Sequence, residues 1–113
     1  MSDIQLFHEQ SPNISYEALY RSTYAQVRKD FAHFCTPIDL QETPQPEEML
    51  EAIVTMLHAL EGDSLKMNSL FYRIDLSEKK KIPNGDIRSL ALMILRREAQ
   101  KVWIRANYSS PQE

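Results

Sequence analysis

Apolar side chains recur at every third or fourth position over four stretches of this 113-residue chain, which is the spacing of one face of an α-helix. The pattern predicts helices over about residues 15–34, 46–61, 65–75 and 86–107. We find no long stretch of strict alternation, which would indicate half-buried strands. The sequence therefore predicts an all-α fold, a compact four-helix and mainly antiparallel bundle that forms a single domain.

Residues suited to helix ends stand at the predicted boundaries. Ser15 and Asp86 have side chains that can accept hydrogen bonds from the N–H groups of a first helical turn. Gly62 provides the permissive backbone that ends the second helix. Either Asp63 or Ser64 can cap the third helix at once, so we expect helices two and three to form a tight antiparallel hairpin.

Prolines define the connection between the first two helices. Pro37 and Pro44 prevent easy continuation of a helix across residues 35–45, whereas Pro46 suits a first helical position. This linker is long for a helical bundle, so we expect it to cross over the end of the fold.

Three segments have no clear helical pattern of their own. Residues 1–13 are expected to form an irregular arm and residues 109–113 a frayed tail. Residues 76–85 are ambiguous, because their first part can extend the third helix before Pro83, Asn84 and Gly85 end it.

Two groups of apolar or aromatic residues are candidates for an interaction face. Tyr16, Tyr20 and Tyr24 follow one another at i+4 spacing, and tyrosine suits interfaces because it combines apolar area with a polar tip. Leu92 and Met93 widen the apolar surface of the last helix nearly all round in its first half, which is typical of a central helix or of one that contacts another subunit. Burial of both groups in the core is the alternative.

The charge of the chain is divided between its two parts. Residues 1–63 hold three basic and eleven acidic residues, a net charge of −8, and residues 64–113 have a net charge of +5. Such a division either holds the two parts together or presents a basic face to a partner. The candidate basic patch comprises Lys79, Lys80, Lys81, Arg97, Lys101 and Arg105. The alternative is a solvated face, because a nucleic-acid binder usually has a basic total charge or a recognition motif.

Glu98 is the acidic residue with the most unusual position. It lies four residues after Ile94 and four before Val102, so it shares part of the apolar stripe of the last helix. A carboxylate there needs a partner, and we take Glu98 and Arg73 as a candidate buried polar pair. The alternative is a glutamate at the helix edge, with its stem packed and its carboxylate in water.

The sequence contains no familiar pattern for catalysis or metal binding. His33 and Cys35 are spaced so that they point apart on a helix, and no residue pair has a usual zinc spacing. The isolated Gly62 and Gly85 exclude glycine-rich phosphate-binding loops. We therefore predict no catalytic residue, no metal and no cofactor, and leave open whether His33, Cys35, His58 and Glu98 meet at a pocket.

The remaining features favour a cytoplasmic protein that acts without catalysis. Cys35 is the single cysteine, the first residues do not resemble a secretory signal, and no apolar run approaches the roughly 20 residues of a membrane span. We expect a small helical protein that works through a protein partner or through self-association as a homo-oligomer. The alternatives are nucleic-acid binding through the basic last helix, and a small metal- or ligand-binding enzyme.

Overall fold

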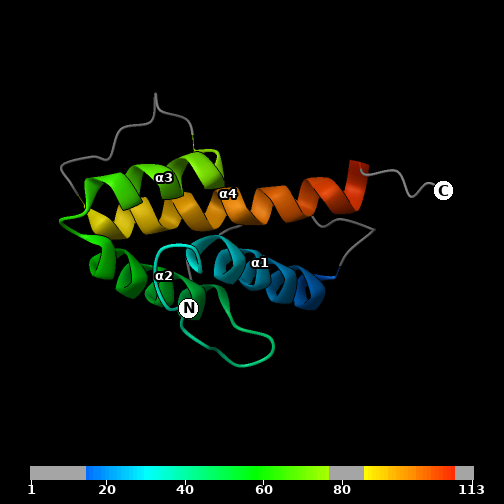
Figure 1. Cartoon of the computed structure of the whole chain (residues 1–113). Helices are drawn as coiled ribbons and strands as arrows, with labels where there is room; N and C mark the ends of the chain where they lie inside the picture. The colour runs from blue at the N-terminus through cyan, green and yellow to red at the C-terminus, as the bar shows by residue number, and fades with distance from the viewer. Residues whose placement is uncertain (1–14, 77–85, 109–113) are drawn as a thin grey trace.

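The computed structural model describes residues 15–76 and 86–108, which form four α-helices (Figure 1). They are α1 (Tyr16–Phe31), α2 (Pro46–Leu60), α3 (Ser64–Ile74) and α4 (Ile87–Tyr108). These described residues contain no strand, and the all-α four-helix prediction is confirmed. The predicted arm over 1–13, the tail over 109–113 and almost all of the ambiguous segment 76–85 lie outside the described residues.

Helix α4 is the element around which the others are arranged. Figure 1 shows α3 along one side of α4, with α1 and α2 along another side. Six apolar residues of α4 are buried: Leu90, Ala91, Ile94, Leu95, Ala99 and Val102. The broad apolar surface predicted for this helix is therefore used to contact several helices of the same chain. None of the helices in the described part combines the length and the apolar character needed to cross a membrane.

Helices α1 and α4 run in opposite directions. Lys101 contacts Asp30, and Arg105, one turn later on α4, contacts Gln26, one turn earlier on α1. The pairing thus moves backwards along α1 as it moves forwards along α4, as an antiparallel arrangement requires.

The core between α1 and α2 follows the predicted helical spacing. Val27 and Phe31 of α1 have no exposed surface, and neither do Met49, Ile53 and Leu57 of α2. The residues of each helix are four apart and therefore share one face. Complete burial of an apolar side chain of this size stabilises the folded state by about 1.5–3 kcal/mol, so this face is a large contribution to folding.

Helix α1 begins as predicted but ends three residues earlier, at Phe31 rather than at Phe34. Its N-terminus is capped by Ser15, whose Oγ accepts a hydrogen bond of 3.1 Å from the N–H of Ala18. At the other end, the N–H groups of Phe34 and Cys35 both donate to the carbonyl of Phe31, at 2.8 and 3.0 Å. This shared acceptor closes the helix in a turn before the proline-containing linker.

The linker is packed against α1. The Tyr24 hydroxyl donates to the carbonyl of Ile38, which ties the linker to the side of α1. Helix α2 then begins with Pro46 at its first position, as predicted, and Glu48 accepts a hydrogen bond of 2.8 Å from the N–H of Gln45.

The turn between α2 and α3 depends on its backbone conformation. Gly62 has a φ of +88°, in the left-handed region that favours glycine. Asp63 then caps α3 by accepting from the N–H of Lys66 at 3.1 Å, which decides between the two caps the sequence allowed. Asp86 plays the predicted role at α4, accepting from the N–H of Arg88 at 3.0 Å.

We predict that Gly62→Ala destabilises the fold by about 1 kcal/mol, because an alanine strains the left-handed backbone conformation at this position. No atom lies within 4 Å of a Cβ built there, so the cost comes from the backbone and not from a clash. Urea unfolding of the wild type and of Gly62→Ala measures the difference in their free energies of unfolding. Gly62→Asn is the control and should cost less, since asparagine tolerates this region better. Equal stability of the alanine variant and the wild type would contradict the prediction.

Candidate functional site

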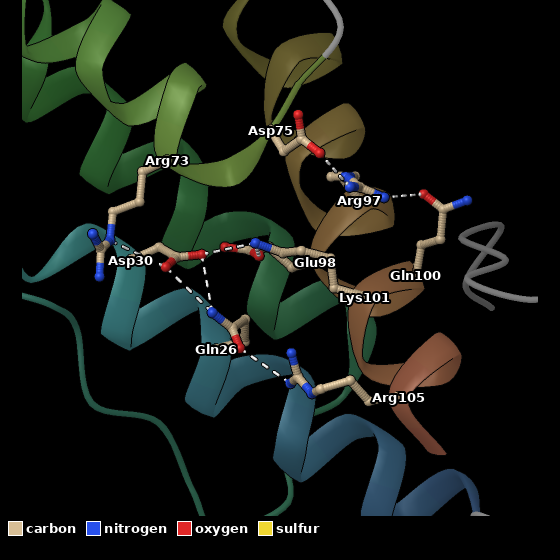
Figure 2. A network of polar contacts seen from close by, with 9 residues as sticks. All are labelled: Gln26, Asp30, Arg73, Asp75, Arg97, Glu98, Gln100, Lys101 and Arg105. Carbon is tan, nitrogen blue, oxygen red and sulfur yellow. Dashed lines mark hydrogen bonds and ion pairs between the residues drawn. The ribbon is translucent and has the colours of Figure 1, made fainter. Parts of the chain in front are cut away.

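A cluster of charged side chains lies at the junction of α1, α3 and α4 (Figure 2). Its centre consists of two acidic residues that are almost completely buried: Asp30 is 3 % exposed and Glu98 has no exposed surface. Lys101, Arg73 and Gln26 surround them. A buried carboxylate is costly unless it is paired, so the contacts in this cluster decide its charge state.

Regular helical spacing brings these residues together. Gln26 and Asp30 are one turn apart on α1, and Glu98 and Lys101 are one turn apart near the middle of α4. Arg73 comes from the last turn of α3 and reaches across to α1. Three segments that are distant in the sequence therefore meet at one point.

Asp30 has a partner for each of its carboxylate oxygens. Its Oδ1 lies 3.3 Å from Nε of Arg73, and its Oδ2 accepts a hydrogen bond of 3.2 Å from Nζ of Lys101. The Gln26 amide nitrogen lies 3.2 Å from both oxygens. Asp30 is thus held as the anion of the cluster.

Glu98 is less well satisfied. Its Oε1 lies 2.8 Å from Nζ of Lys101, an ion-pair distance, but neither of its oxygens has a well-directed hydrogen-bond donor among the described residues. Lys101 is shared between Glu98 and Asp30, so a single ammonium group serves two carboxyl groups.

The two acidic residues have pKa values that move in opposite directions. Burial, reinforced by hydrogen bonding to Asp30, raises the pKa of Glu98 to about 8, and Lys101 offsets only part of this effect. For Asp30, burial acts to raise the pKa, but hydrogen bonds from Glu98, Gln26 and Lys101 together with the Lys101 charge lower it. At neutral pH the cluster therefore contains one neutral and one ionised carboxyl group.

The sequence predicts a buried polar pair of Glu98 and Arg73, but the pair leaves out Asp30, which lies between them in the structure. The structure buries Glu98, but Arg73 forms its ion pair with Asp30, and Glu98 contacts Lys101 instead. Asp30 carries the same signal as Glu98, because it lies three residues after Val27 on the apolar stripe of its helix. The position of Asp30 on the apolar stripe of α1 was thus a signal in the sequence that could have identified the cluster.

The candidate basic patch is divided between described and undescribed residues. Lys79, Lys80 and Lys81 lie outside the described part of the chain. Arg97 contacts Asp75 and Gln100, each at 2.8 Å. Lys101 lies within the buried cluster, and Arg105 donates to Gln26 at 3.1 Å. The row of positive charge on α4 thus faces α1 and α3, where each of its three members makes an internal contact.

The five residues proposed as an interaction face do not form one surface. Tyr24 is buried, whereas Tyr16 is 43 % exposed and stacks on the half-buried Tyr20 with ring centroids 6.0 Å apart. Leu92 and Met93 are half-buried, and Leu92 packs against the core. Because α1 and α4 are antiparallel and pair near Asp30 and Lys101, the tyrosines and Leu92 lie towards opposite ends of this helix pair.

His33, His58 and Cys35 do not form a metal site among the described residues. His33 is exposed, Cys35 is half-buried, and His58 is exposed and lies 3.0 Å from Glu61. Burial, the larger effect, raises the pKa of the Cys35 thiol against the opposing charge of Lys66. Across residues 15–76 and 86–108, no three histidine, cysteine or acidic side chains are grouped in a way that could hold a metal ion.

The outer face of α3 carries an apolar surface that the sequence analysis did not single out. Leu65 is 80 % exposed and Tyr72 is 87 % exposed, on the side of the helix opposite the buried Leu70 and Ile74. Leu65 and Tyr72 are seven residues apart, so they share one face of the helix. Their spacing was available in the sequence, but only the structure shows that no other part of the described chain covers them.

No protein-family model, curated protein or solved structure matches this chain. Its function is therefore inferred from the positions and contacts of its own side chains.

We predict that the stability of the protein falls as the pH rises from about 5 to about 8, and that Glu98→Gln removes most of this loss. In this range Glu98 keeps its proton in the folded state but loses it in the unfolded chain, so the folded state binds more protons. The effect is on the order of a few kcal/mol. Asp30 acts in the opposite sense and only at lower pH, because its pKa is lowered.

Urea unfolding at several pH values between about 5 and 9 checks this prediction, since the loss should follow the range in which Glu98 releases its proton. Glu47→Gln is the matched control, because Glu47 is an exposed acidic residue of α2. Its stability should depend on pH as the wild type does. Parallel curves for the wild type and Glu98→Gln would show that Glu98 is ionised in the folded protein.

We predict that Lys101→Met destabilises the fold by about 3–5 kcal/mol at neutral pH, because it leaves two buried carboxyl groups without their shared cation. Arg73→Met should cost about 1 kcal/mol or less, because the Arg73 side chain is 37 % exposed and its ion pair is partly screened by water. Thermal or urea unfolding compares the two variants. A larger loss for the Arg73 variant would show that Arg73 is the main partner of the buried acids.

Proposed function

We propose that this protein is a non-catalytic binding protein that contacts another protein through the outer face of α3. The exposure of Leu65 and Tyr72 on one helix face carries this proposal. Large apolar side chains that project together into water are typical of contact surfaces, and tyrosine is enriched among residues that dominate binding energy. The cytoplasmic location inferred from the single cysteine is part of the same proposal.

The charged residues support a structural role for the cluster rather than a catalytic one. Asp30, Glu98 and Lys101 bind one another in the interior, where Lys101 already serves two acids. The row of positive charge on α4 is engaged with α1 and α3, which favours protein binding over contact with nucleic-acid phosphates.

A shallow open hollow beside α1 is a weaker candidate for a binding site than the outer face of α3. It is lined by Ala25, Arg28, Lys29, Ala32 and Pro37. Both of its charged residues are exposed, and Arg28 is paired with Asp39 at 2.9 Å. Such a surface has none of the enclosure that small-molecule sites require, so the α3 face is the stronger candidate.

We predict that the double variant Leu65→Ser/Tyr72→Ser loses binding partners that the wild type retains. The full chain is immobilised, retained proteins are identified, and each is purified and titrated against both forms. The expected loss in affinity is at least about tenfold, because burying each of these side chains is worth roughly 1.5–3 kcal/mol. A second copy of this chain counts as a partner in this assay.

Ile104→Ser is the matched control, because Ile104 is an exposed apolar residue of another helix, α4. Circular dichroism of all variants should match the wild type, since the substituted side chains are exposed. If the double variant binds the same partners as the wild type with equal affinity, the α3 face is not the contact surface.

A further inference from the structure

Helix α3 is attached to the rest of the fold by fewer buried side chains than α1 or α2. Leu70 and Ile74 are its two buried residues, whereas α1 has six and α2 has eight. A residue in the left-handed region stands at each end of α3, Gly62 with a φ of +88° and Asp75 with a φ of +69°. The chain therefore changes direction sharply on both sides of this helix. A short segment with few buried contacts between two such points is expected to open before the rest of a fold does.

The last turn of α3 lies against α1 and α4 where these two helices carry the buried acids. Arg73 lies 3.3 Å from Asp30 of α1 (Figure 2). Asp75 lies 2.8 Å from Arg97 of α4, the residue before Glu98. Opening of this turn would take Arg73 away from Asp30 and give water access to the acids between α1 and α4.

We infer that α3 is a lid over the two acids that opens independently of the other helices as the pH rises, because Glu98 has to reach water in order to ionise. Among the described residues, Lys101 is the cation that contacts Glu98, and it is shared with Asp30. An ionised Glu98 would add a second buried anion to that single ammonium group, which is costly. Opening of α3 hydrates this anion. The inference does not depend on the proposed function, because it concerns the inner side of α3 and not Leu65 and Tyr72.

The surroundings of Glu98 favour its protonated form in the closed state. Burial raises its pKa most, Asp30 of α1 raises it further, and Lys101 of its own helix lowers it. The guanidinium group of Arg73, from α3, is paired through Nε with Oδ1 of Asp30. It therefore neutralises Asp30 rather than Glu98.

The other charged side chains of the packed helices make contacts elsewhere. Arg97 donates to Asp75, and Arg105 donates to Gln26. The acidic residues and the histidine of α2 and of its C-terminal cap are all exposed: Glu47, Glu48, Glu51, His58 and Glu61. Within the described part of the chain, an ionised Glu98 thus has no second cation in contact with it.

Glu98 holds its proton more tightly in the closed state than in the open state. Burial raises its pKa to about 8 when α3 is closed, and hydration in the open state returns it towards the ordinary value of 4.5. Between these values the closed state binds more protons, so the opening constant of α3 should rise by up to about tenfold per pH unit. Above about pH 8 the rise should level off, because Glu98 is then ionised in both states. Asp30 does not contribute, since its pKa is lowered and it stays ionised over this range.

Hydrogen exchange of the full chain, followed by NMR between about pH 5 and 9 and corrected for the intrinsic exchange rate of each amide, tests the inference. The amides of Leu70 and Phe71 in α3 should exchange through an opening in which those of Ile94 and Leu95 in α4 stay protected. The opening constant measured for α3 should rise with pH up to about pH 8 and then level off.

Glu98→Gln should remove the pH dependence of α3 opening, because glutamine stays neutral over this range. Glu47→Gln is the matched control and should keep the pH dependence of the wild type, since Glu47 is exposed. The same rise with pH in Glu98→Gln as in the wild type overturns the inference.

Two outcomes in the wild type alone also overturn it, so the test does not depend on the folding of Glu98→Gln. If the amides of α3 and α4 exchange together at every pH, α3 opens only when the whole chain unfolds. If the opening constant of α3 stays constant or falls as the pH rises, Glu98 ionises without leaving the closed state.

Discussion

Burial of α4 against α1 and α2 is the contact on which the rest of the structure depends. Four buried residues of α4, Leu90, Ala91, Ile94 and Leu95, form one continuous core with the fully buried apolar residues of α1 and α2. Such a core is non-directional, because apolar side chains gain by leaving water whatever their exact partner. It explains why the helices associate, but it does not by itself decide how far α4 is shifted along α1.

The buried acids supply that missing specificity. Desolvating Asp30 and Glu98 is costly, and pairing with Lys101 recovers only part of the cost, so the cluster adds little to stability. A shift of α4 by one turn, however, would carry Lys101 and Glu98 away from Asp30, which would keep only Arg73 and Gln26 as partners. We infer that the cluster selects one alignment of α1 and α4 by making the others unfavourable. Glu98 avoids most of the desolvation penalty of a buried charge, because its raised pKa keeps it protonated at neutral pH.

Helix α3 is held differently from the other helices. Only two of its residues, Leu70 and Ile74, are buried, and ion pairs at its C-terminal end connect Arg73 to α1 and Asp75 to α4. The half-buried Met67 and Phe71 also pack against the core, and Asp63 caps the first turn. Most of the circumference of the helix therefore faces away from the core, and this is why Leu65 and Tyr72 are exposed.

The sequence alone determined the number of helices, most of their ends and the composition of the core, because these follow from local spacing and from capping residues such as Ser15, Gly62 and Asp86. It also indicated that Glu98 is unusual. The identity of its partners was decided by the tertiary structure, since Asp30, Arg73 and Lys101 come from three helices whose packing no local pattern specifies. Helix packing also decides which side chains are exposed. Tyr24 and Tyr72 are indistinguishable as isolated residues, and only the packing of the helices buries the first and leaves the second in water.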